Sequence, residues 1–281
     1  MSTALAYFFC DEGFVVAADG RDILVSANGC QIASDQAQKI FPVQGVDREA
    51  AFSFTGRTTL FDSADQDEVF DFPREFSMAA QNTRLDAMRD AGTFLSTVCP
   101  LVRERLESVV RGGGIGRLPS RSDRANPSEH NIVTIHLDGY FSGYPARMAA
   151  HFYHVQQQIS WDTNADHTLE GLGRYWARLL GSSKIRRLLF DTEDARLSRY
   201  RTEACRKAAA CYRDPSISMA LQEAIDAGQH FIAACSDDSI RELDPENCRG
   251  IGGRIHIATI TPKDGFQWVH GFEPIPTANP V

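Results

Sequence analysis

The chain has 281 residues, with 29 Lys and Arg against 37 Asp and Glu and a formal net charge of −8 at pH 7. This acidic balance argues against a nucleic-acid binder and against a protein that binds anionic membranes, because both partners attract basic surfaces. Hydrophobic residues make up 43% and charged residues 23% of the chain, which is typical of a soluble globular protein.

The first 55 residues predict strands. The apolar segments "TALAYFFC" and "GFVVAAD" are separated by the turn residues 11–13 and predict an antiparallel hairpin. A second hairpin is predicted for "QKIFPV" and "EAAFSFTG", with its turn between Gly45 and Arg48. Apolar residues at consecutive positions are typical of strands in a sheet that is covered on both faces.

The hydrophobic pattern then changes to a helical one. Residues 76–98 are rich in Ala, Met, Leu and Arg and contain no Pro, and apolar residues at helical spacing continue from Val102 to Val110. Pro100 is expected to kink this region or to separate it into two helices. The Gly-, Ser- and Pro-rich segment 111–129 predicts a flexible surface loop.

Strands and helices alternate in blocks over the rest of the chain. Strands are predicted for 131–140 and 149–161, helical structure for 173–210, a further helix near Ser216, and two closing strands on either side of a turn at 261–264. Blocks of strands separated by helices favour an α+β layered fold with mostly antiparallel sheets. The chain shows neither an internal repeat nor an interdomain linker, so we expect a single domain over residues 1–281.

Five residues near the start of the chain form a set. They are Thr3 on the first strand, Gly13 at the turn, Asp19 in "VVAADGR", Lys39 in "AQKIFPV" and Gly56 in "SFTGRTT". The set resembles the opening of a proteasome β-type subunit of the N-terminal-nucleophile (Ntn) hydrolase superfamily, so the chain looks like a bacterial proteasome-like protein. The close match is confined to the first sixty residues, and the remainder matches as an order of elements.

The resemblance implies a four-layer αββα sandwich, in which helices flank two packed antiparallel sheets, and a threonine-type endopeptidase. Thr3 would be the nucleophile, and its own α-amine the general base. Lys39 would favour the deprotonated Thr3 group, Asp19 would orient Lys39, and the Gly56 amide would stabilise the oxyanion. The resemblance further implies a polypeptide substrate, a homo-oligomeric ring, an ATPase as candidate partner, and neither cofactor nor metal.

The start of the chain leaves the nucleophile open. Thr3 becomes the first residue only after both Met1 and Ser2 are removed. Removal of Met1 alone exposes Ser2, which is therefore an alternative nucleophile. A shift of one residue turns the side chain to the opposite face of a strand, so the two choices are not equivalent.

Two later motifs of the family depart from its pattern. The counterpart of its Gly-Ser-Gly before a helix is interpreted as Gly171-Leu172-Gly173, and Leu172 has no hydroxyl. The counterpart of its Asp-x-x-Ser-Gly-Gly is interpreted as residues 248–253, with Cys248 and Ile251 at the polar positions. The alternative function is therefore a catalytically silent subunit with an assembly or binding role.

Other features of the sequence predict no further chemistry. The N-terminus has no signal-peptide pattern, and no apolar run reaches the ~18 residues of a membrane span, so a cytoplasmic protein is expected. His151 and His154 would face opposite sides of a strand, which argues against a metal pair. The segment 112–116 predicts a loop and not a phosphate site, and the acidic segment 236–246 predicts a solvated turn and not a calcium loop.

Overall fold

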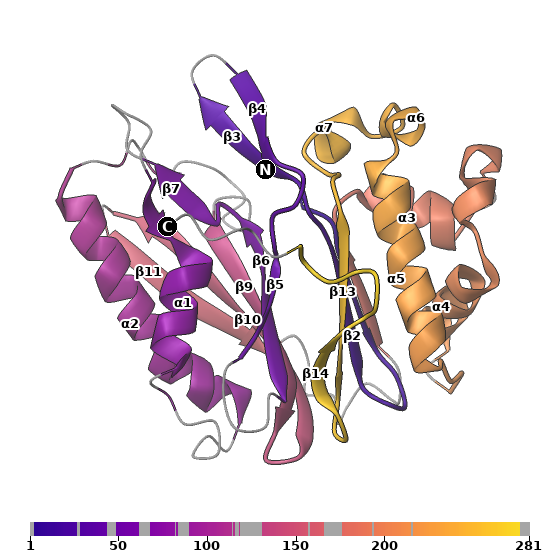
Figure 1. The fold of residues 1–281 in the computed structure, drawn as a ribbon, viewed down its shortest axis with the longest axis horizontal. Coiled ribbons are helices and arrows are strands. Elements are labelled where there is room, and N and C mark those ends of the chain that lie inside the picture. Colours follow the sequence, from indigo (N-terminus) through magenta and orange to yellow (C-terminus); the bar gives the residue numbers. More distant parts are fainter. Residues whose placement is uncertain are drawn as a thin grey trace. The chain divides into compact units, whose positions relative to one another are not determined.

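The structure is a computed structural model. It describes residues 3–26, 29–43, 49–61, 68–81, 83, 90–113, 115, 118, 131–156, 158–165, 176–192, 194–214 and 216–275, without the side chains of 24–26, 29, 30, 165, 176 and 212. These residues form two compact units (Figure 1). The first unit combines Met1–Ile40 with Glu170–Val281, and the second is Phe41–Leu169.

The first unit contains a five-stranded antiparallel sheet. Its strand order is β12 (Trp176–Leu180), β1 (Leu5–Phe9), β2 (Phe14–Asp19), β13 (Ile255–Thr261) and β14 (Gly265–Trp268). The predicted first hairpin is confirmed, with Leu5 paired to Ala18. Gly13 is required in its turn, because a Cβ there would lie 2.3 Å from the carbonyl oxygen of Ile260.

Helices cover one face of this sheet. The helices of this unit are α3 (Ser183–Phe190), the 3₁₀ helix η5 (Ala195–Tyr200), α4 (Glu203–Arg213), α5 (Leu221–Ser236), α6 (Asp238–Arg241) and α7 (Pro245–Cys248). Alternate strand residues such as Ala6 and Ala17 share one buried apolar cluster with Phe231 and Ile232 of α5. Gly228 lets α5 approach the sheet closely, since a Cβ there would lie 3.2 Å from that of Ala17.

Two parts of this unit differ from the sequence predictions. The predicted helical segment 173–210 was wrong at its start, because Trp176–Leu180 pairs with β1 as the edge strand β12. The residues between Asp19 and Lys39 contain a further hairpin, β3 (Asp22–Ser26) and β4 (Gly29–Ser34), which the sequence analysis did not predict. This hairpin accounts for the length of the segment between Asp19 and Lys39, and Figure 1 shows it at the top of the first unit.

The second unit also has a five-stranded sheet covered by helices on one face. The strand order is β11 (Gln158–Ala165), β10 (Tyr144–Val155), β9 (Asn131–Phe141), β6 (Ala50–Gly56) and β5 (Ile40–Pro42). The strands β7 (Thr59–Phe61) and β8 (Glu68–Asp71) form a separate two-stranded sheet. Phe52, Phe54 and Ile135 of the large sheet form one apolar core with Phe76 and Phe94 of the helices.

The helices of the second unit are α1 (Phe72–Gln81) and α2 (Ala91–Arg111). The side chain of Asp90 caps α2 by accepting a hydrogen bond from the Thr93 amide. The expected separation of two helices at Pro100 was wrong, because Pro100 lies inside α2, whereas a kink at Pro100 stays a prediction. Burial of Leu95, Val98 and Leu106 on one continuous face offsets the backbone hydrogen bond that proline cannot donate.

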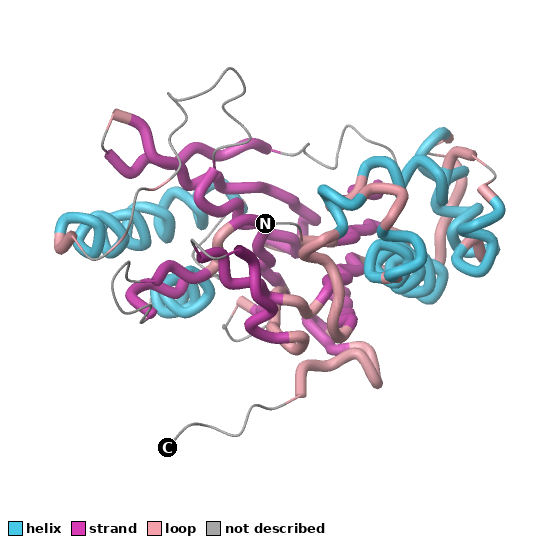
Figure 2. The backbone as a smooth tube through the Cα atoms, turned by 90° about the horizontal axis from the view of Figure 1, so that it is seen from above, coloured by secondary structure: helices cyan, strands magenta, loops and turns pink. Residues whose placement is uncertain are grey.

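The structure therefore confirms a mixed α+β fold with antiparallel sheets, shown by secondary structure in Figure 2. The stacking of the sheets into a four-layer αββα sandwich and the single domain over 1–281 stay predictions. Most of the predicted loop 111–129 lies outside the described residues. None of the helices in the described ranges is both long enough and apolar enough to span a membrane.

Candidate active site

Asp19 is a buried charge at the end of an apolar strand. All six residues of β2 are buried, and Asp19 is the last of them, with an exposed fraction of 0%. Lys39 lies beyond the β3–β4 hairpin, and its Nζ is 2.9 Å from Asp19 Oδ1. Asp19 and Lys39 therefore form a buried ion pair, and their roles in catalysis stay predictions.

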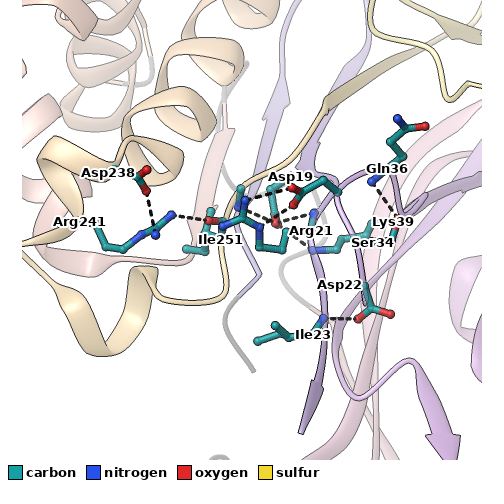
Figure 3. A network of polar contacts seen from close by, with 12 residues as sticks. Asp19, Arg21, Asp22, Ile23, Ser34, Gln36, Lys39, Asp238, Arg241 and Ile251 are labelled. Carbon is teal, nitrogen blue, oxygen red and sulfur yellow. Dashed lines mark hydrogen bonds and ion pairs between the residues drawn. The ribbon is translucent and has the colours of Figure 1, made fainter. Parts of the chain in front are cut away.

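The Asp19 carboxylate holds three other segments of the chain besides Lys39 (Figure 3). Its Oδ1 accepts hydrogen bonds from Lys39 Nζ and from the Ala4 amide, each at 2.9 Å. Its Oδ2 accepts hydrogen bonds from the amides of Arg21 and Gly252, each at 3.2 Å. The carboxylate thus joins the start of β1, the end of β2, the segment that carries Lys39, and the segment before β13.

Burial and the neighbouring N–H donors shift the pKa of the Asp19 carboxyl in opposite directions. Burial raises the pKa of the Asp19 carboxyl, whereas the Lys39 ammonium and the amides of Ala4 and Gly252 act to lower it. All four contacts come from N–H donors, so they stabilise the ionised form. A charged Lys39 next to a buried carboxylate is the arrangement that can bias the protonation of a neighbouring nucleophile.

Thr3 directly precedes Ala4, whose amide donates a hydrogen bond to Asp19. It is half-buried and lies two residues before β1, on the strand position that shares a face with Leu5. β1 is central between β2 and β12, since Leu5 pairs with both Ala18 and Leu180. Thr3 is therefore next to the Asp19–Lys39 pair along the backbone, whereas the alternative nucleophile Ser2 lies outside the described residues.

Gly56 belongs to the second unit and is the last residue of β6. Its φ is +100°, and a Cβ there would lie 2.7 Å from the carbonyl oxygen of Ile132, so a side chain is excluded by the local backbone. The role of its amide as an oxyanion donor to Thr3 stays a prediction.

The segment before β13 encloses the Asp19 cluster. Ile251 is fully buried, and its carbonyl accepts a hydrogen bond from Arg241. Gly253 has a φ of +74°, and a Cβ there would lie 2.4 Å from the carbonyl oxygen of Asp35. That carbonyl accepts the Arg254 amide at 2.7 Å, so two consecutive glycines let this segment pass between Asp19 and Asp35.

The structure also brings together two residues that the sequence analysis missed. Ser182 lies between Gly181 and Ser183, directly before α3, and its Oγ caps the helix by accepting the Ile185 amide at 3.0 Å. The same hydroxyl donates a hydrogen bond of 2.5 Å to Asp244 Oδ2, and both residues are buried.

Ser182 is a serine that directly precedes a helix, whereas Leu172, at the position where the sequence analysis placed such a residue, lies outside the described residues. The register of β1 and β12 continues from Leu5 and Leu180 toward Thr3 and Ser182. A Cβ on Gly181 would lie 3.3 Å from Ala4 Cα, so Ser182 begins α3 beside the start of β1. The signal in the sequence was the Gly-Ser-Ser triplet after an apolar run.

His256 lies on β13 beside this cluster. It pairs with Ala18 in the register, is fully buried, and neither ring nitrogen has a hydrogen-bond partner among the described residues. Burial, together with the positive charges of Arg254 and Lys39, lowers the pKa of His256 to about 4. His256 is therefore neutral at pH 7. Within the described part of the chain, no three His, Cys, Asp or Glu residues are placed to hold a metal ion.

Comparisons with known proteins found similarity only among solved structures. No protein-family model matches the chain, and no curated protein matches it significantly. One similar structure is an Anbu (Gly-1) mutant from Hyphomicrobium sp. strain MC1, with a TM-score of 0.45 and 15% identity over 95% of this chain and 85% of that one. Another is Anbu (ancestral beta-subunit) from Yersinia bercovieri, with a TM-score of 0.43 and 12% identity over 96% of this chain and 88% of that one.

The prediction that the chain is a proteasome β-type subunit, or a bacterial proteasome-like protein of the Ntn hydrolase superfamily, is wrong, because the two similar structures named above are Anbu proteins. The physical reason is that the resemblance rested on a short set of residues. A buried Asp–Lys pair at a strand end fixes a local backbone arrangement and does not identify one kind of subunit. Similarity at these TM-scores assigns neither a family nor an activity, so the functional argument rests on the site itself.

Proposed function

We propose that the protein is a threonine-type hydrolase of peptide bonds in which Thr3 becomes the N-terminal nucleophile after Met1 and Ser2 are removed. The observation that carries this proposal is that Asp19 Oδ1 accepts both the Ala4 amide and Lys39 Nζ at 2.9 Å. One carboxylate oxygen thus fixes the backbone next to Thr3 and the ammonium that would act on it.

The reaction needs few groups. The Thr3 hydroxyl attacks the substrate carbonyl while its proton passes to the α-amine of Thr3, and the amine leaving group takes up a proton as the peptide bond breaks. Water then hydrolyses the resulting ester. The charged Lys39 favours the neutral amine and the nascent alkoxide, and the Gly56 amide is proposed as the oxyanion donor.

The experiment uses chain released from a cleavable fusion so that Thr3 is the first residue. Hydrolysis of a panel of fluorogenic peptides is compared for this chain, for chain that starts at Met1, and for the Thr3→Ser and Thr3→Val variants. We expect activity only with a free Thr3 or Ser at that position, and none with the nearly isosteric Thr3→Val. Equal hydrolysis by Thr3→Val, or no hydrolysis of any peptide by the Thr3-first chain, would refute the proposal.

A catalytically silent protein with an assembly or binding role is the second candidate. It is favoured by Ile251, which is fully buried where a hydroxyl was expected, and by the structural use of Asp19, which also holds Gly252. The mature N-terminus distinguishes the candidates. Intact mass and N-terminal sequencing of protein from its native cells should give a chain that starts at Thr3 if it is an enzyme and one that keeps Met1 or Ser2 if it is silent.

Self-assembly into a homo-oligomeric ring, an ATPase partner and a cytoplasmic location are proposed with either function. Light scattering tests the first of these directly. A mass that is a multiple of 31.1 kDa at micromolar concentration is expected, and a persistent monomer would contradict it.

A further inference from the structure

A cavity of about 480 Å³ lies within the first unit, and nothing described above uses it. Its lining residues come from two segments, 34–38 and 268–275. The first segment leads directly into Lys39, and the Ala37 amide donates a hydrogen bond of 2.8 Å to the Gly20 carbonyl. The volume is in the range of protein sites that hold small ligands, roughly 300–1,000 Å³.

Glu273 supplies a negative charge to this cavity. Its Oε2 is buried and has no hydrogen-bond partner among the described residues, while Oε1 lies 3.8 Å from Nδ1 of the exposed His270. Hydrogen bonds from its own amide and the Gly271 amide, with the charges of His270 and Arg254, lower the pKa of Glu273. The nearby Arg254 donates to the backbone carbonyls of Glu273 and Gly271, each at 3.0 Å, and so leaves Oε2 without a donor.

Trp268 gives the cavity an aromatic wall. Edge-on contacts hold its ring, with centroid distances of 5.1 Å to Phe266 and 6.3 Å to His256. The face of an indole ring attracts cations, most strongly where water is partly excluded. A fixed aromatic ring together with an ionised carboxylate is a combination that recognises organic cations.

Two glutamines add neutral polar groups. Gln38 Nε2 donates a hydrogen bond of 2.7 Å to the Ile40 carbonyl, which fixes its carboxamide and leaves the amide oxygen as an acceptor. Gln36 is exposed on the same segment, and its backbone amide donates to Ser34 Oγ at 3.0 Å (Figure 3). The Gln38 amide oxygen is therefore one acceptor, beside the Glu273 carboxylate, for the N–H groups of a bound cation.

We propose that this cavity binds an organic cation, a primary ammonium, supplied either by a Lys side chain of a peptide or by a free amine. The cation would pair with the Glu273 carboxylate and lie against Trp268, with its N–H groups directed to Gln38. The proposal goes beyond the hydrolase function, because it requires neither N-terminal processing nor a free Thr3 amine.

Isothermal titration calorimetry tests this proposal on the full chain carrying Thr3→Val, which cannot hydrolyse by the proposed route. The ligands are Nα-acetyl-lysine methylamide, its neutral isostere Nα-acetyl-norleucine methylamide, and butylamine as a free amine. We expect saturable binding of at least one cation, loss of binding for the norleucine compound, and at least about tenfold weaker binding in Glu273→Gln, a loss of one charge pair. Binding of the lysine compound but not butylamine indicates a peptide side chain, and the reverse indicates a free amine.

Matched variants complete the test. Trp268→Phe keeps an aromatic ring and should weaken binding less than Trp268→Leu, whereas Glu104→Gln on the exposed surface of α2 should leave it unchanged. Circular dichroism shows whether each variant is folded. Equal binding of the neutral compound, or unchanged binding in folded Glu273→Gln, would overturn the proposal, and so would the absence of binding by both cations. None of these binding results depends on the Thr3 hydrolysis assay, so this proposal and the proposed hydrolase function can fail separately.

Discussion

The Asp19–Lys39 pair should stabilise the fold asymmetrically, with Asp19 contributing more than Lys39. In Lys39→Met, the carboxylate loses the ammonium but keeps the amides of Ala4, Arg21 and Gly252. In Asp19→Ala, the ammonium and all three amides lose their acceptor at once. Because each orphaned buried donor carries its own desolvation cost of about 1–3 kcal/mol, Asp19→Ala should be the more destabilising change.

The expected magnitudes follow from the burial of both groups. The exposed fractions of the two side chains are 0% for Asp19 and 8% for Lys39, and removing one partner of a buried ion pair typically costs about 3–5 kcal/mol. We expect the free energy of unfolding to fall by about 3 kcal/mol in Lys39→Met and by about 5 kcal/mol or more in Asp19→Ala. With a urea m-value of about 3 kcal/mol/M, Lys39→Met should lower the midpoint by about 1 M.

Urea unfolding followed by both fluorescence and circular dichroism measures this difference. Coincident transitions are needed before the midpoints are converted to free energies, because the chain forms two compact units. Arg206→Met is the matched control, since Arg206 and Glu203 form an exposed pair worth less than about 1 kcal/mol. A midpoint for Lys39→Met equal to wild type, or a smaller loss for Asp19→Ala than for Lys39→Met, would refute the reasoning.

Two other predictions concern residues next to the pair. His256 has a folded-state pKa of about 4, whereas its unfolded value is about 6.5, so the unfolded chain binds the proton first as the pH falls. The free energy of unfolding should therefore fall by up to about 3 kcal/mol between pH 6.5 and pH 4. This dependence of the urea midpoint on pH should become weaker in His256→Phe but not in His270→Gln. Gly253→Ala should lower the thermal midpoint clearly more than Gly143→Ala, because both glycines have positive φ but only Gly253 faces a backbone atom, the Asp35 carbonyl oxygen at 2.4 Å; equal shifts would show that the contact is relieved without cost.

The parts of the fold that sequence could predict are those with a local signal. The first hairpin follows from two apolar runs around a turn ending at Gly13, and the closing strands from a similar pattern. β12 was missed because Ala, Arg and Leu favour helices and its strand state is imposed by pairing with β1. Pro100 was given too much weight, because local propensity yields to a continuous buried face on α2.

The candidate site, like the fold, could be predicted from sequence only where a local signal exists. Asp19 and Lys39 were paired through the resemblance, and physical chemistry supports the pairing because a charge at the end of an apolar strand needs a partner. The Gly-Ser-Ser triplet at Ser182 and the acidic residue Asp244 each also fit an ordinary helix cap or turn. Only the fold joins these two residues, which are 62 positions apart. The Trp268 and Glu273 cavity likewise depends on two distant segments meeting.

Because Asp19 fixes several backbone segments, loss of activity in its variants cannot separate a catalytic role from a structural one. The same holds in part for Lys39, whose removal changes both the ion pair and any charge acting on the nucleophile. Thr3 is different: it is half-buried, and none of the hydrogen bonds that hold the Asp19 cluster comes from its side chain. Thr3→Val should therefore abolish hydrolysis while the urea midpoint stays at the wild-type value, and a catalytic role can be assigned to Lys39 only through its effect on the reactivity of Thr3.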